Sequence, residues 1–217
     1  MVIAFDQDVH VLSPVTNNRY QIKNAIRQTA FGDGTSLYEA VDYVINQQMR
    51  HIQGRKAVVL FTDGVDTTSR RASYQSTIAA TEEVDSLFYT IRYDTQRDMS
   101  GGGGGNYPQP NRRGNGRSVT MADILGAILT GGNVNVGGGG PGGGGSSSEY
   151  ETGRKYLEAI AQNSGGRKFE AQSMTNLQAA FSGIAEELRR QYSLGYYPEA
   201  VGKIGERKQI KVRVNRP

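Results

Sequence analysis

The run AVVLFT at residues 57–62 constrains the fold of this chain more than any other stretch. Its residues are mostly apolar and β-prone, on both of the faces that alternate along a strand. A strand with two apolar faces must be covered on both sides, as in a parallel sheet between layers of helices. The run stops on Asp63, which Gly64 and Asp66 follow. We therefore expect a buried strand with a carboxylate at its carboxyl end.

Strand-like and helix-like segments alternate along most of the chain. The sequence predicts strands at residues 2–5 (also buried), 8–16, 57–62, 86–93, 167–171, 192–197 and 208–214. It predicts helices at 18–30, 36–52 and 73–83, and two more with inner stripes spanning 150–161 and 177–188. This alternation is typical of an α/β sandwich around a mostly parallel sheet.

Several local details can be predicted as well. Ser36 and Glu39 have the spacing of a capping box. The buried stripe of that helix is expected at Leu37, Val41, Val44, Gln48 and Ile52. Gly165 and Gly166 are expected to end the helix before them. Three tyrosines near the end are expected in the core or on a sheet face: Tyr192, Tyr196 and Tyr197.

Residues 94–148 differ from the rest of the chain in composition. They hold 18 of the 29 glycines. Such a segment buries too little apolar surface to offset its ordering entropy, so we interpret it as a flexible insertion. Its stretch 118–132 is either a short helix or plain disorder. The predicted domain therefore comprises residues 1–93 and 149–197, with 198–217 as a basic C-terminal strand extension.

Charge and rare residues exclude several kinds of function. The chain has no Cys and only two His, far apart, so thiolate and His-rich metal sites are not expected. The net charge is +4. Residues 198–217 carry six Lys or Arg and two Glu, and six minus two accounts for all of it. A solvated face explains such a tail better than an anionic surface, and we expect no nucleic-acid partner. No apolar run is long enough to span a membrane.

Two oxygen-bearing side chains are expected to meet at one edge of the sheet. Ligands of open α/β sheets bind outside the carboxyl ends of the strands, where Asp63 lies. Thr35 precedes the helix at 36–52 and is expected near the same edge. A hydroxyl and a carboxylate suit Mg²⁺, which takes oxygen ligands and retains waters. The alternatives remain open that Thr35 or Ser36 is only a helix cap and that Asp63 is only an Asx-turn residue.

The segments FGDGTSLYEAV and KAVVLFTDGVD resemble the von Willebrand factor A-type domain. The ending, with YLEAIAQNSGGRKFEA and LRRQYSLGYYPEAVGKIGERKQIKVRV, is similar to bacterial VWFA-related proteins. The resemblance implies a Rossmann-like three-layer α/β/α fold. It also implies a metal-ion-dependent adhesion site, in which Thr35 and Asp63 match two ligand positions. Ser36 and Asp66 are candidates for the surrounding rim that contacts a partner.

One departure from this family concerns the metal site. The family supplies further ligands from a D-x-S-x-S motif at the end of its first strand, and this chain contains no such motif. Asp6 and Asp8 fall in a hairpin and do not replace it. The resemblance therefore implies a domain without the first strand and helix. We expect Mg²⁺, or Mn²⁺ or Ca²⁺, to bind this chain weakly or not at all.

Three functions follow from these observations. The first is a non-enzymatic adhesion or protein-interaction module, whose partner offers a carboxylate to the metal. The second is a metal-assisted hydrolase or phosphoryl transferase using Asp63, which the absence of nucleotide-binding and nucleophile motifs disfavours. The third is a metal-free structural scaffold within a larger exported protein. An extracytoplasmic location is implied by the resemblance alone.

Overall fold

The computed structural model describes residues 1–29, 34–93, 146–171 and 174–192, and the single residues Tyr197, Gly202 and Arg213. Nearly all of the predicted insertion 94–148 lies outside these residues, including the stretch 118–132. So do most residues of the two strands predicted nearest the C-terminus. Helix α6 begins at Ser147, inside the segment predicted as insertion.

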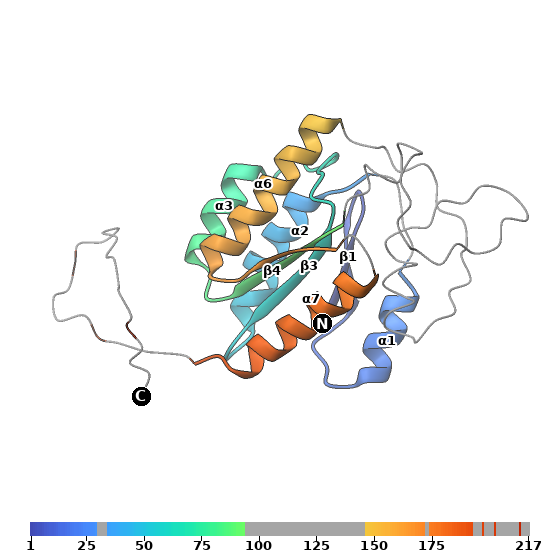
Figure 1. Ribbon diagram of the computed structural model, residues 1–217. Coiled ribbons are helices and arrows are strands. Elements are labelled where there is room, and N and C mark those ends of the chain that lie inside the picture. Colours follow the sequence, from blue (N-terminus) through green and yellow to red (C-terminus); the bar gives the residue numbers. More distant parts are fainter. Residues whose placement is uncertain are drawn as a thin grey trace, which may run out of the picture.

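The strands form two separate sheets (Figure 1). In the larger sheet β3 (Ala57–Thr62), β4 (Leu87–Arg92) and β5 (Lys168–Glu170) lie parallel in that order. In the smaller sheet β1 (Val2–Phe5) pairs antiparallel with β2 (Val9–Ser13). The parallel sheet and the predicted hairpin are both confirmed.

Helices cover both faces of the parallel sheet. Figure 1 shows α2, α3 and α6 on one side and α7 on the other, with α1 beyond the hairpin. The helices are α1 (Arg19–Arg27), α2 (Leu37–Tyr43), α3 (Tyr74–Glu83), α6 (Ser147–Ser164) and α7 (Met174–Arg189). This three-layer arrangement is consistent with the Rossmann-like α/β fold that the resemblance implied.

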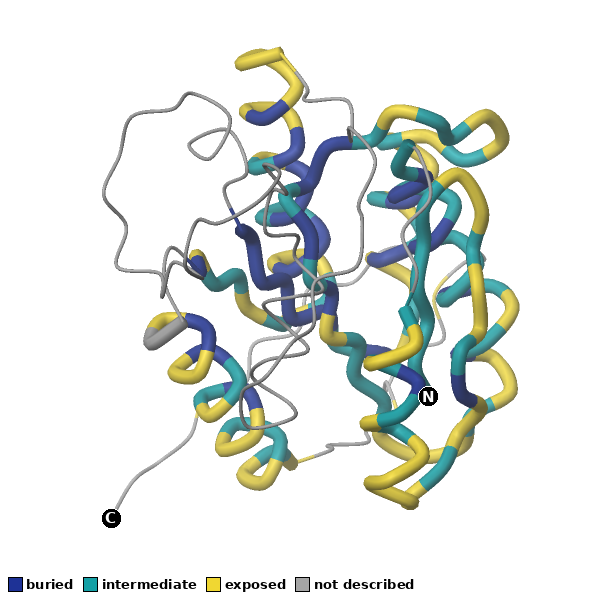
Figure 2. The backbone as a smooth tube through the Cα atoms, turned by 90° about the vertical axis from the view of Figure 1, so that its right-hand side faces the viewer, coloured by how far each residue is buried: buried dark blue, intermediate teal, exposed yellow. Residues whose placement is uncertain are grey.

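The core consists of two clusters separated by β4. Phe88 of β4 packs with α2 and α6, where Leu37 and Ile160 are fully buried. Tyr89 and Ile91 point to the opposite side and pack with α7. Figure 2 shows the buried residues gathered in the centre of the chain trace. The alternation along β4 therefore holds the two helical layers on one strand.

The helix predicted at 36–52 does not stay α-helical. After α2 it continues as the π-helical segment η1 (Val44–Gln48) and the 3-10 turn η2 (Met49–His51). The wider π turn rotates the buried stripe, so Ile45 and Met49 are buried where Val44, Gln48 and Ile52 were predicted. Leu37 and Val41 keep their predicted places.

The sequence signals of α6 and α7 are confirmed. The predicted stripe of α6 is buried throughout, and α6 ends at Gly165 in the left-handed conformation, with φ of 79°. Leu177, Ala180 and Ile184 are the buried residues of the α7 stripe.

Other burial predictions are wrong. All four residues of β1 are half-buried, and Val59 in the middle of β3 is 41% exposed. The reason is that β1 and β3 each have a strand neighbour on one side only among the described residues. Tyr192 and Tyr197 are 92% and 100% exposed, so neither lies in a core. Tyr196 lies outside the described residues.

A close backbone contact joins the loop after β3 to α6. Gly64 has φ of 90°, and a Cβ atom there would lie 2.7 Å from the carbonyl oxygen of Gly153. A Cβ atom on Gly153 would in turn lie 2.5 Å from the backbone of Gly64. Both positions therefore need glycine, and the contact fixes the height of α6 relative to the end of β3.

We predict that Gly153→Ala destabilises the protein by about 1–3 kcal/mol, because the methyl group collides with backbone that cannot yield cheaply. Gly183→Ala is the matched control, since its Cβ would meet only Phe169 at an ordinary 3.8 Å. That variant should gain up to about 1 kcal/mol from helix propensity. Urea denaturation of both variants measures the difference. Equal effects would show that the Gly64–Gly153 contact does not constrain the fold.

Candidate functional site

Thr35 and Asp63 both line a cavity that runs along β3, from Arg55 and Lys56 at the start of the strand to Asp63 at its end. Thr35 lies just before α2, and Asp63 directly follows β3. Both residues are half-buried. The two residues that the sequence singled out as metal ligands thus both lie on the wall of this elongated cavity.

Hydrogen bonds join the loop that carries Thr35 to the loop that follows Asp63. The backbone N–H of Thr35 donates to Oγ1 of Thr67 at 2.8 Å. Its carbonyl oxygen accepts from the backbone N–H groups of Thr67 and Thr68, at 2.9 and 3.2 Å. Three bonds of this kind hold Thr35 at a fixed place relative to the end of β3.

The carboxylate of Asp63 forms an Asx turn. Its Oδ1 accepts a hydrogen bond from the backbone N–H of Val65 at 3.0 Å. The N–H of Gly64 donates to Oγ1 of Thr62 at 3.2 Å, and the positive φ of Gly64 lets the chain turn sharply here. The turn explains why the strand ends on this residue and fixes the orientation of its carboxylate.

Ser36 is fully buried, with 0% of its surface exposed. Its Oγ donates to the carbonyl oxygen of Gln7 at 2.6 Å and shares a hydrogen bond of 2.8 Å with Oγ1 of Thr68. Its N–H donates to the carbonyl oxygen of Asp6 at 2.6 Å. Ser36 therefore holds three loops together, and a partner cannot reach it in this conformation as a rim residue.

The predicted capping box does not form. Ser36 is the N-cap residue of α2, but its side chain makes no capping bond there. Oδ1 of Asp66 accepts from the N–H of Tyr38 at 3.1 Å, and Oγ of Ser69 accepts from the N–H of Glu39 at 3.2 Å. The free N–H groups of the first turn are thus satisfied by a distant loop.

Asp66 is more a loop-organising residue than an open rim residue. Besides Tyr38, it accepts from Oγ and from the backbone N–H of Ser69, at 2.6 and 3.3 Å. Burial, and secondly the charge of Asp66, raises the pKa of Tyr38. Asp66 therefore holds the loop after β3 against the start of α2.

Glu39 makes a second connection to that loop. Its Oε1 accepts from the backbone N–H groups of Arg70 and Arg71, at 2.8 and 3.0 Å. These two hydrogen bonds lower the pKa of Glu39 below its ordinary value of 4.5. The carboxylate also lies in the first turn of α2, where the helix dipole favours negative charge.

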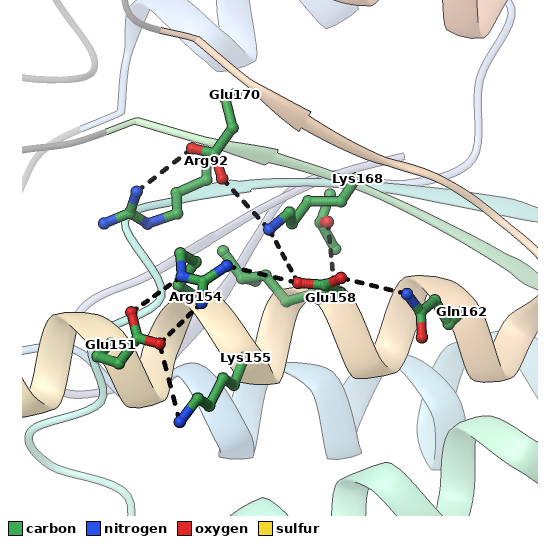
Figure 3. Close-up of polar contacts among 10 residues, drawn as sticks. Arg92, Glu151, Arg154, Lys155, Glu158, Gln162, Lys168 and Glu170 are labelled. Carbon is green, nitrogen blue, oxygen red and sulfur yellow. Dashed lines mark hydrogen bonds and ion pairs between the residues drawn. The ribbon is translucent and has the colours of Figure 1, made fainter.

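A network of charged residues, which sequence reasoning missed, lies along α6 and the ends of β4 and β5 (Figure 3). Arg92 pairs with Glu170 at 3.3 Å, and Lys168 pairs with both Glu158 and Glu170. Arg154 bonds Glu151 at 2.7 Å, which lowers the pKa of Glu151 to about 2. The spacing along α6 could have revealed the helical pairs. The pairs between strands depend on sheet order, which the sequence does not give.

Comparison with known families gives a match to the first part of the chain. The family model described as von Willebrand factor type A domain matches residues 1–65, a range that includes Thr35 and Asp63. Over these residues the chain is similar to the von Willebrand factor A-type family. Such domains are generally non-enzymatic protein-interaction modules, and they often bind divalent metals. Comparison with curated proteins and with solved structures gave no match. Among the described residues, no helix is long and apolar enough to cross a membrane.

The oxygen donors of Thr35 and Asp63 fit a divalent cation in kind. The Thr35 hydroxyl and the Asp63 carboxylate are the hard oxygen ligands that Mg²⁺ prefers. Yet the described residues contain no group of three or more His, Asp or Glu that could hold a metal. Thr35 and Asp63 would hold the cation, which would supply a positive charge for an incoming carboxylate. Waters, hydroxyl groups or carbonyl oxygens would have to supply the rest of the coordination shell.

We predict that Asp66→Ala lowers the free energy of unfolding by about 1.5–3 kcal/mol, because it removes hydrogen bonds to a charged group and strands the N–H of Tyr38. Asp85→Ala is the control, since the side chain of Asp85 is 97% exposed and pairs with Lys56 only at 3.8 Å. That variant should change stability by less than about 0.5 kcal/mol. Denaturant titration compares the two, and equal losses would contradict the role given to Asp66.

We predict that Glu39 makes stability depend on pH in the acid range. Its pKa is lowered by folding, so its stabilising effect is present above pH 4.5 and is lost as the pH falls through the folded-state pKa. Glu39→Gln should therefore lower the melting temperature at neutral pH. The difference in melting temperature between the variant and the original chain should become smaller below pH 4.5. A difference in melting temperature that is the same at all pH values would show that the ionisation of Glu39 does not affect stability.

Proposed function

We propose that this domain binds a protein partner through a divalent cation held by Thr35 and Asp63. The observation that supports the proposal most is that both residues line one cavity, on loops that hydrogen bonds hold to each other. A cation there carries unsatisfied positive charge, and a carboxylate from the partner is the group that completes its shell. Mg²⁺ is the proposed cation, with Mn²⁺ and Ca²⁺ as substitutes.

The affinity of this chain for the cation should be weak. Two protein donors are fewer than a Mg²⁺ ion normally needs, even with retained waters. The Asx turn also uses Oδ1 of Asp63. A partner carboxylate would therefore contribute a large share of the binding energy, so that cation and partner bind together.

A metal-free scaffold is the second candidate. It is favoured by the internal bonds of Ser36 and Asp66, which use their oxygens to hold the fold together. In that case the loops at this edge stabilise the domain, and partner contacts lie elsewhere. An extracytoplasmic location, and an origin among bacterial VWFA-related proteins, belong to both proposals. They rest on family resemblance and on the occurrence of such domains in extracellular proteins.

We predict that Mn²⁺, a paramagnetic substitute for Mg²⁺, broadens the NMR signals of the backbone amides of Thr35, Gly64 and Val65. Asp63→Asn should abolish the effect by removing the charged donor. Asp85→Asn, which lies before β4 and thus at the opposite end of the sheet, should leave it intact. Broadening that persists in Asp63→Asn would reject Asp63 as a ligand and favour the scaffold.

The strength of binding is a separate test. Calorimetry with Mg²⁺ alone should give no affinity in the micromolar range for this chain. Adding a short peptide with a glutamate should increase the Mn²⁺ broadening, because its carboxylate completes the shell. Micromolar Mg²⁺ affinity without a peptide would contradict the incomplete donor set.

A further inference from the structure

The outward face of α1 carries a stripe of positive charge. Arg19, Lys23 and Arg27 lie four residues apart along this helix, and all three are exposed. Residues at this spacing share one side of a helix, with about 6 Å of rise between them. The helix, with the sequence RYQIKNAIR, contains no acidic residue. Among the described residues, none of the three cations has an acidic partner.

Two other helices neutralise their exposed cations within the helix. On α6, Arg154 pairs with Glu158 four residues later (Figure 3). At the end of α7, Arg190 pairs with Glu186 at 2.7 Å. Like charges at this same spacing destabilise a helix, so the stripe on α1 works against the stability of its own helix. Such a stripe is explained if another molecule supplies the negative charges.

The chain itself has no acidic segment that could cover the stripe from outside the described residues. Residues 94–148 hold three Asp against four Arg, and residues 198–217 hold two Glu against six Lys or Arg. A second copy of the chain also carries a net charge of +4, which disfavours its approach. The matching negative charge is therefore expected on a different molecule.

An open polar pocket adjoins the stripe. It has a volume of about 400 Å³ and lies between α1 and Leu12 of β2. Four side-chain amides line it: Asn18, Gln21, Asn24 and Gln28. Apart from Asn18, which caps the helix, these amides have no hydrogen-bond partner among the described residues. Tyr20, which is 71% exposed, also lines the pocket and directly follows Arg19, so it lies between the pocket and the stripe.

We propose that this face of α1 binds an extended acidic segment of a partner protein. Alternate side chains of an extended chain lie about 6.6–6.8 Å apart on one side, which is close to the rise between neighbouring cations of the stripe. Carboxylates at every second position would therefore each face one cation. Side-chain amides both donate and accept, so the pocket matches the N–H and C=O groups of the segment's main chain. Arg and Tyr are also enriched where protein partners bind most strongly.

The surroundings of the stripe favour a polypeptide over other anionic partners. Phosphate groups of a nucleic acid or a lipid accept hydrogen bonds, so they would use only the donors of the amides. Stable binding of a helix to a lipid surface also needs an apolar face that can insert. The opposite face of α1 instead lies against the β1–β2 hairpin, with Ala25 buried. The proposed binding uses neither Thr35 nor Asp63, so it does not depend on the cation proposed above.

The test is an NMR titration of the protein at low ionic strength and in EDTA. The peptide has three glutamates alternating with threonine, Gly-Ser flanks and blocked ends. Amide signals of α1 should shift, and the affinity should fall with added NaCl because salt screens exposed charges. A peptide with glutamine in place of glutamate should bind at least about tenfold more weakly. A peptide with three adjacent glutamates should bind about threefold more weakly, since its middle carboxylate points away.

Two triple variants place the binding on α1. Replacing Arg19, Lys23 and Arg27 with Gln should weaken peptide binding about tenfold. The matched control replaces three exposed cations elsewhere with Gln: Arg50, Arg70 and Arg189. It changes the net charge equally and should keep the affinity within about twofold of the original. The melting temperature of the α1 variant should stay the same or rise, because a repulsion is removed. If that variant does not fold, the glutamine peptide still tests the proposal on the unaltered protein.

Several results would each overturn the proposal. Equal binding of the glutamate and glutamine peptides would show that the carboxylates are not recognised. Equal weakening by the control variant would show only a general effect of charge. Tighter binding of a single-stranded oligonucleotide, or of vesicles with anionic phospholipid, at the same α1 residues would assign the stripe to phosphate groups. A lower melting temperature of the α1 variant would give the stripe a structural role. Peptide binding that requires Mg²⁺ and is lost in Asp63→Asn would belong to the proposed cation site instead.

Discussion

The hydrogen bonds between the start of α2 and the loop after β3 determine the geometry of the whole carboxyl edge. Asp66 and Ser69 satisfy the N–H groups of the first turn of α2, and Glu39 returns two bonds to Arg70 and Arg71. These bonds cross about thirty residues of sequence and place two loops side by side. The place of Thr35 beside the loop that follows β3 is a consequence of this connection.

The layered fold could be predicted from the sequence because apolar periodicity reflects burial directly. The stripe of α6 and its end at Gly165 are local signals, and both are confirmed. The capping box of Ser36 failed because Asp66 supplies a bond that the local pattern cannot reveal. The predicted buried stripe of the helix is wrong after Val41, because the helix widens there into a π turn.

The candidate site also has features that local sequence patterns predict and features that depend on distant contacts. Thr35 and Asp63 could be placed at one edge because strand ends and helix starts follow from element boundaries, and both residues do line one cavity. Whether they hold a metal stays a prediction. Ser36 seemed available from its residue type alone, but it is buried. The pairing of Arg92 with Glu170 was missed because it depends on β4 and β5 being neighbours, which pattern alone does not establish.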